Sequence, residues 1–196
     1  MQKLLIAFLL SSWVISSQAA WQLDNESSQL NFVSIKAHDV GENSRFRQLE
    51  GTIGDDGQVE IKINLGSIDT KVEVRDQRMQ EHLFETTTYP QAILTAELAA
   101  DKIEKLQVGQ VITESISVHL DLHGITKLLA ISVLVTRLSA DKLLVVSQQP
   151  VIVNAADFDL AYGISKLQEI AKLPKISLAV PVTFSLTFMQ EKKTSE

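Results

Sequence analysis

The sequence predicts an all-β protein, a closed antiparallel β-barrel of about eight strands with two short helical insertions. Apolar and polar residues alternate over long runs, most regularly at 175–188, and such alternation is typical of antiparallel strands with one wet face. Two stretches, 70–90 and 163–174, have helical spacing instead. A long sheet with one dry face must cover that face, by stacking or by closing on itself.

The strand runs follow one another from residue 28, separated by turn residues. We expect strands at 28–37, 45–53, 58–65, 91–100, 111–124, 125–138, 142–158 and 175–188. In the first run the apolar residues do not all fall on one face of the strand, which indicates a bulge or twist. The 142–158 strand should kink at Pro150, because proline cannot donate to a ladder. Asp56-Gly57 and Gly124 favour tight turns between strands.

The first helical stretch interrupts the strand pattern. Thr70 and Glu73 have the spacing of a capping box, in which each side chain satisfies a backbone N–H at the helix start. On a helix, Val72, Met79 and Leu83 share one face. We therefore expect a lid, whose apolar face either completes the core or lines a ligand cavity. The second helical stretch, 163–174, ends at a proline.

Residues 1–19 have the three-part pattern of a secretory signal peptide. Lys3 precedes an apolar run too short to span a bilayer comfortably, and small residues favour cutting after Ala19, or alternatively after Ala20. We expect a mature domain at 20–190, a disordered tail at 191–196 and a location in the periplasm. The lack of any cysteine suits this compartment better than the extracellular space of an animal.

Composition and motifs argue against nucleic-acid binding and catalysis. The formal net charge is −6 and no basic patch is present. The common nucleotide-binding, nucleophile-elbow and zinc-protease motifs are missing. His119, Asp121 and His123 alternate along one strand and could offer metal ligands, but Val118 and Leu120 occupy the dry face. We therefore expect the three polar residues in solvent, with no metal, no cofactor and no enzymatic activity.

Several short motifs occur in order along the chain: LNF at 30–32, GTI at 51–53, SIDT at 67–70 then RD at 75–76, LFE at 83–85 then YP at 89–90, LDLHGITK at 120–127, and DF at 157–158. Together they resemble the YceI-like family, lipocalin-like periplasmic barrels associated with polyisoprenoid-type lipids. The sequence departs from the family pattern at Arg78-Met79, at 154–159 and in the length of 163–174. These departures suggest a divergent subgroup with a changed pocket.

The resemblance implies a long apolar tunnel that holds an isoprenoid chain, such as that of a quinone. Our first hypothesis is periplasmic binding, storage or transport of an elongated apolar lipid such as a polyisoprenoid, with room for transient membrane contact. The alternative is a filled barrel that docks a membrane or a partner protein through its helical segments. From parity and spacing, the expected ligand contacts are Phe32, Phe46, Ile61, Ile63, Met79, Leu83, Phe84, Leu94, Phe158 and Phe184.

Overall fold

A computed structural model describes residues 19–191 of the chain. The predicted signal peptide, up to residue 18, and most of the predicted tail lie outside the described residues. In chain order the elements are β1 (Ala19–Leu23), β2 (Gln29–Lys36), β3 (Val40–Phe46), β4 (Leu49–Gly54), β5 (Gln58–Asn64), η1 (Leu65–Ser67), β6 (Ile68–Asp69), α1 (Glu73–His82), β7 (Gln91–Glu97), α2 (Ala100–Glu104), β8 (Val111–Leu122), β9 (Ile125–Ser139), β10 (Lys142–Ser147), β11 (Val151–Asn154), η2 (Ala155–Phe158), α3 (Ala161–Ala171) and β12 (Ala179–Gln190).

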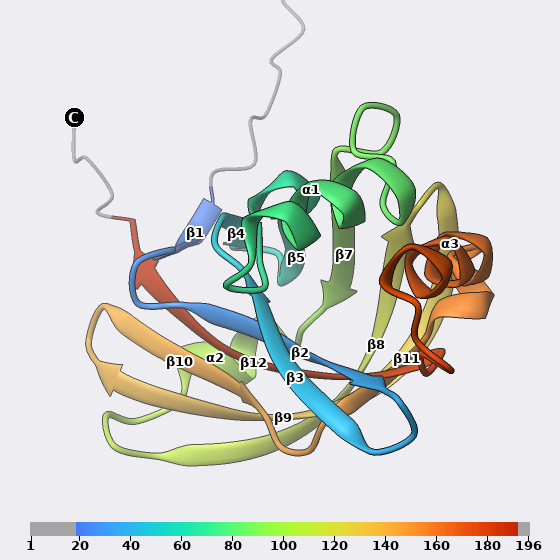
Figure 1. Ribbon diagram of the computed structural model, residues 1–196. Helices are drawn as coiled ribbons and strands as arrows, with labels where there is room; N and C mark the ends of the chain where they lie inside the picture. Colours follow the sequence, from blue (N-terminus) through green and yellow to red (C-terminus); the bar gives the residue numbers. More distant parts are fainter. Residues whose placement is uncertain (1–18, 192–196) are drawn as a thin grey trace, which may run out of the picture.

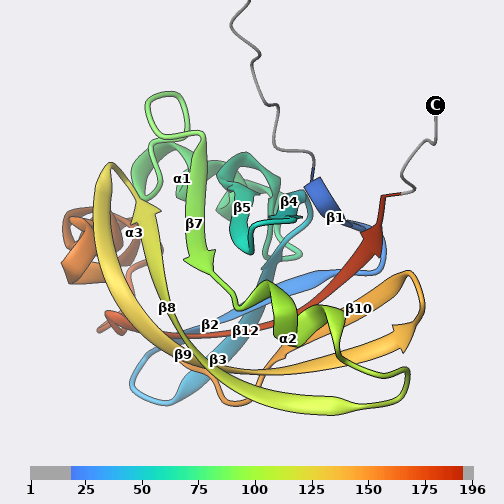
Figure 2. The same ribbon diagram turned by 180° about the vertical axis from the view of Figure 1, so that it is seen from behind.

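The strands form a closed antiparallel barrel, as the sequence predicts (Figure 1). The ring runs β1-β4-β5-β7-β8-β9-β10-β12 and is closed by pairing of β1 with β12. From β12 the sheet also continues through β2 to β3 and β6, while β11 pairs with β12 on its other edge. Helices α1 and α3 cover one end of the barrel, and α2 lies toward the other end (Figure 2).

Two predicted strands are each divided in the structure. The 142–158 run forms β10, β11 and η2, with the break at Pro150, which has no N–H to donate to a ladder. The 45–53 run divides because β3 pairs with β2 and β6 whereas β4 pairs with β1 and β5. Between them, the Ser67 hydroxyl accepts the N–H groups of Arg47 and Gln48 and holds this corner.

The core follows the alternation of the strands. On β5, Val59, Ile61 and Ile63 are buried while their neighbours are more exposed. The most completely buried large side chains include Phe158 and Phe188. Tight turns occur where expected. In the 54–57 turn, the Gly57 N–H donates a hydrogen bond to the Gly54 carbonyl at 3.0 Å.

The capping box predicted for α1 is wrong. The helix begins at Glu73 after Val72, and neither residue makes a side-chain cap. Lys71 has a φ of 63° and turns the chain, so that Thr70 faces Asp76, donating from both its N–H and its hydroxyl to the Asp76 carboxylate. Val72 is 44% exposed and does not belong to the buried face of α1.

Asp69, in β6 just before α1, anchors this turn. Its buried carboxylate accepts the Lys71 N–H at 3.0 Å and lies 3.0 Å from both Arg45 Nε and Arg47 Nη2. The Lys71 N–H, followed by the two arginines, lowers the pKa of Asp69 from 3.8 to about 2. The entry to α1 is therefore fixed by a charged carboxylate.

Candidate functional site

The barrel encloses a cavity of about 320 Å³ beneath α1 and α3. This volume lies at the lower end of the range usual for small-molecule pockets. Inward side chains of β2, β3, β5, β7, β8, β9, β11 and β12 form its walls, and most of them are apolar. The barrel is therefore hollow at this end, unlike the filled barrel of the alternative hypothesis.

Most of the predicted contact residues come together around this cavity. The ones that line it are Phe32, Phe46, Ile63, Met79, Leu83, Phe84, Leu94 and Phe184. Ile61 and Phe158 are buried but do not belong to the described lining. Ile61 packs over Gly51, and Phe158 lies in η2 with 1% exposure. Strand parity identifies inward residues, yet it does not separate those that face a cavity from those that fill the core.

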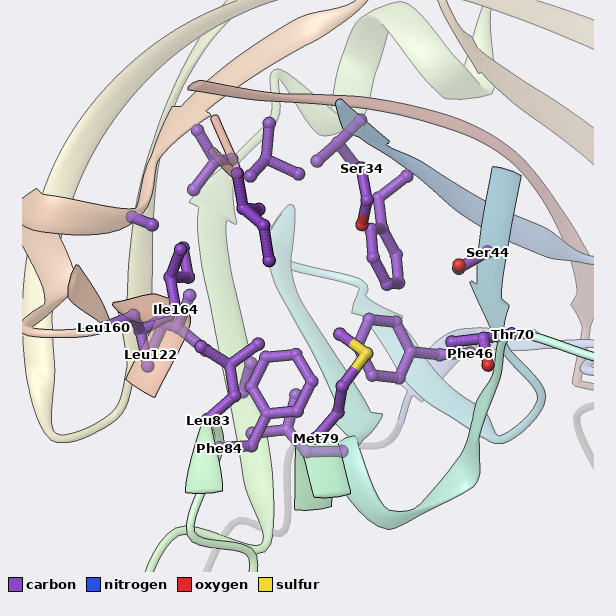
Figure 3. A pocket seen from close by; sticks show the side chains of 18 of the residues that line it. Ser34, Ser44, Phe46, Thr70, Met79, Leu83, Phe84, Leu122, Leu160 and Ile164 are labelled. Carbon is purple, nitrogen blue, oxygen red and sulfur yellow. The ribbon is translucent and has the colours of Figure 1, made fainter. Parts of the chain in front are cut away.

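Helix α1 supplies the roof through residues with helical spacing. Figure 3 shows Met79 of α1 reaching into the cavity together with Leu83 and Phe84, which directly follow the helix. Leu160 and Ile164 of the α3 region lie beside Leu83. The aromatic rings form a chain. Phe46 lies 5.5 Å from Phe32 and 5.7 Å from Phe84, centroid to centroid. Phe32 and Phe46 are tilted and Phe46 meets Phe84 edge-on, and such aromatic pairs stabilise the wall beyond simple burial.

The two covering helices meet where α1 ends and α3 begins. Gly163 of α3 packs against the backbone of His82 and Leu83 at the end of α1. Near its start, α1 contacts β3 through the ion pair between Arg75 and Glu42. The chain after α3 runs beside the end of β2, where the Ala37 N–H donates a hydrogen bond to the Lys175 carbonyl at 2.9 Å. The mouth of the cavity therefore lies between these helix ends and the β2–β3 hairpin.

Charged groups gather at this mouth. Among the described lining residues, the charged ones are Lys36, Glu42, Arg75 and Arg78. The Lys36 ammonium lies 2.7 Å from one Glu42 oxygen and Arg75 pairs with the other. The hydrogen bond from Lys36, assisted by Arg75, lowers the pKa of Glu42. Arg75 also donates to the Thr70 carbonyl at 2.7 Å, while its Nε is buried without a partner in the described structure.

Sequence reasoning missed the polar lining and the contribution of α3. Ser34 and Lys36 lie on the same face of β2 as Phe32, so strand parity could have found them. Leu167 and Ile170 line the cavity from α3, and their helical spacing was a usable signal. Ser44, 5% exposed on β3, carried no signal because an isolated serine on a strand is usually a surface residue.

His119, Asp121 and His123, the candidate metal ligands, lie in different environments. His119 is exposed, and Asp121 accepts a hydrogen bond from Thr126 at 3.1 Å. The expectation that His123 is solvated is wrong. It occupies the β8–β9 turn with a φ of 55°, its side chain is 11% exposed, and its ring lies 4.3 Å from Tyr89. Within residues 19–191, no group of three potential ligands could hold a metal ion.

Comparison with known proteins identifies the fold family. A family model described as a YceI-like domain matches residues 21–188. The chain belongs to the YceI-like family. This confirms the resemblance inferred from the short motifs, and the YceI-like region contains every residue that lines the cavity. No curated protein matches the sequence.

Several solved structures share the fold. A polyisoprenoid binding domain from Saccharophagus degradans, implicated in plant cell wall breakdown, has a TM-score of 0.88 and 38% identity, covering 89% of this chain and 100% of its own. BcnA from Burkholderia cenocepacia has a TM-score of 0.66 at 17% identity, covering 84% and 98%. The YceI protein of Campylobacter jejuni gives 0.51 at 14%, covering 76% and 85%.

Of the helices in the described part of the chain, none has the length and apolar character needed to cross a membrane.

Proposed function

We propose that this protein binds, stores or transports an elongated apolar lipid of the polyisoprenoid or prenyl-quinone type in the periplasm, without catalysis. The observation that carries the proposal is the cavity, whose interior is apolar and whose charged residues lie at its mouth. The Saccharophagus degradans relative, 38% identical, is a polyisoprenoid binding domain, which supports the same class of ligand here. The signal-peptide pattern at 1–19 supports the location.

The distribution of polarity favours one orientation of the lipid. Burial of each chain methylene contributes about 0.8 kcal/mol, less the cost of ordering the chain. At the mouth, Lys36, Arg75 and Arg78 outnumber Glu42, so that a polar or anionic end finds donors there. An apolar chain in that place would strip water from charged groups, which is unfavourable. The proposed complex therefore has its chain inside and its polar end at the mouth.

Adaptability of the lining suits a flexible chain. Met79 is unbranched and fits irregular shapes, and it lies beside the aromatic wall of Phe46 (Figure 3). The lining hydroxyls of Ser34 and Ser44 can accept a hydrogen bond from a polar substituent or donate one to it. The Thr70 hydroxyl, which donates to Asp76, can still accept one. None of these groups needs to perform chemistry for binding to occur.

The test is to purify the protein from periplasmic extract, extract it with organic solvent and analyse the extract by mass spectrometry. We expect a prenyl lipid in stoichiometric amount. Added prenyl lipid should also raise the melting temperature of the stripped protein, because a ligand at about 100 times its Kd stabilises the fold by about 2.7 kcal/mol. Absence of both a bound lipid and a thermal shift would contradict the proposal.

A further inference from the structure

Positive charge collects around the mouth of the cavity, although the chain as a whole is acidic. The mouth lies between the β2–β3 hairpin, the start of α1 and the end of α3 with the chain that follows it, at residues 36–42, 70–78 and 166–177. These segments hold seven lysines and arginines against five aspartates and glutamates, whereas the rest of the chain holds eleven against nineteen. The mouth therefore has a formal charge of +2 and the remainder of the chain −8.

Three lysines of the mouth are exposed and have no ion-pair partner in the described part of the chain. Lys71 turns the chain into α1, Lys172 caps the end of α3 and Lys175 follows shortly after. Ala171 and Leu173, the neighbours of Lys172, line the cavity, so that this lysine lies on the rim of the opening. The ion pairs at the mouth use other cations. These three ammonium groups are therefore available to an anion outside the protein.

Two exposed valines lie beside these charges. Val40 is 46% exposed at the start of β3, where it pairs with Lys36 of β2 and lies two residues before Glu42. Both of these charged residues line the mouth. Val74 is 49% exposed on α1, one turn before Arg78, which also lines the mouth. Single exposed valines are ordinary on a protein surface, but aliphatic side chains among unpaired cations are typical of a surface that binds a membrane interface.

We propose that this end of the barrel docks on an anionic phospholipid bilayer, with the mouth facing the membrane. The three lysines contact lipid phosphates, and Val40 and Val74 enter the interfacial layer. The acidic remainder of the chain is repelled by the same surface, so the protein docks in one orientation. An apolar chain then passes between the bilayer and the cavity without exposing its methylenes to water. The inference goes beyond the proposed function, because it concerns the outer surface and applies with or without a bound lipid.

Vesicle binding tests the role of charge at the mouth. The mature protein is mixed with vesicles of phosphatidylcholine, either pure or with an equal part of phosphatidylglycerol, and bound protein is measured by co-sedimentation. We expect binding to the anionic vesicles only, and it should fall about tenfold as salt rises from about 50 mM to about 500 mM. One lysine near an anionic surface strengthens binding about fivefold, so Lys172→Gln/Lys175→Gln should weaken it about 25-fold.

A second pair of lysines gives the matched control. Lys105 directly follows α2, and Lys142 pairs with Met189 near the end of β12, whereas the start of β12 lies at the mouth. Lys105→Gln/Lys142→Gln therefore removes the same charge from the far side of the barrel. It should change vesicle binding by less than about twofold, because charges beyond a Debye length from the surface are screened.

A dye on a single cysteine identifies the residues that meet the membrane, because the natural chain has no cysteine. Val40→Cys and Val74→Cys each carry an environment-sensitive fluorophore. Val108→Cys, at a valine that is 63% exposed between α2 and β8, is the control. On anionic vesicles we expect a blue shift and brighter emission at positions 40 and 74, with no change at position 108.

The outcomes separate this inference from the proposed function. Absence of binding to anionic vesicles would overturn the inference and leave this face to a protein partner. Equal weakening by the two lysine pairs, or a blue shift at position 108 as large as at position 40, would overturn docking through the mouth. The proposed function would still stand if the protein binds prenyl lipid in detergent solution. Vesicle binding as expected, by a protein that yields no prenyl lipid and shows no thermal shift, would support docking and contradict the proposed function alone.

Discussion

Gly163 of α3 lies so close to Leu83 that a Cβ on Gly163 would come within 2.8 Å of the Leu83 Cα atom. The carbonyl of His82 would be closer still. This is the point at which the two helices that cover the cavity meet, and the start of α1 and the chain after α3 both reach the β2–β3 hairpin at its mouth. A side chain at Gly163 therefore acts as a wedge between the helices.

We predict that Gly163→Ala destabilises the protein by about 1–3 kcal/mol, the usual cost of an overpacked contact. Separation of the helices should also speed exchange of bound prenyl lipid. Urea unfolding and lipid-release kinetics measure the two effects. Gly41→Ala is the matched control, because its nearest neighbour would be 3.5 Å away, an ordinary contact. Equal stability of the two variants would contradict a tight helix contact.

Met79→Arg should abolish the thermal shift caused by prenyl lipid. Met79 is 7% exposed and lines the cavity, so a guanidinium there would place a charge against the chain, which is unfavourable. The expected loss is the whole stabilisation of about 2.7 kcal/mol at 100 times Kd. Gln77→Arg adds the same charge on the exposed face of α1 and should keep the shift. A full shift in Met79→Arg would show that α1 does not line the bound lipid.

Asp69→Asn should weaken the fold at neutral pH and flatten its acid response. Because the pKa of Asp69 is lowered to about 2, its contribution is present above about pH 4 and is lost as the pH falls toward 2. Replacement of the charge-assisted hydrogen bonds should cost about 1–2 kcal/mol at pH 7, given that both arginines are largely exposed. Thermal melts from pH 7 to pH 2 measure this. The exposed turn variant Asp39→Asn should change stability by less than about 0.5 kcal/mol.

Lys36→Met should raise the pKa of Glu42. The hydrogen bond from Lys36 is the largest cause of the lowered value, and methionine keeps the apolar stem while removing the charge. Carbon-detected NMR titration of the Glu42 carboxyl gives the measurement. Lys127→Met, on an exposed position of β9, serves as the control. An unchanged pKa of Glu42 would contradict the role of Lys36 and would mean that Arg75 alone keeps this pKa low.

Sequence patterns predicted the barrel well because its strands obey a local rule. A period of two places Val59, Ile61 and Ile63 on one face whatever lies opposite them. The same rule cannot tell that β3 and β4 pair with different neighbours, since partners far along the chain decide this. The corner at Arg47 depends on Ser67, which no pattern near residue 47 reveals.

The site was predictable in part for the same reason. Helical spacing identified Met79 and Leu83, and parity identified Phe32 and Leu94. The capping box failed because the backbone of Lys71 adopts a left-handed conformation that redirects Thr70 to Asp76. The short ladder between β7 and β8 could not be predicted, because β7 pairs with β8 only over Ile93–Ala96 and the chain then turns away into α2.

Strand β12 has neighbours from both ends of the chain. It pairs with β1 and β2 along one edge and with β10 and β11 along the other. The Thr187 N–H and hydroxyl also bind Ser28 and Ser27, across 159 and 160 residues. Because β12 follows every other strand in the chain, a growing polypeptide cannot close the ring until this segment has emerged. Contacts of such high sequence separation predict slow folding, and until β12 arrives the edges of β1 and β10 remain open to a chaperone or to aggregation.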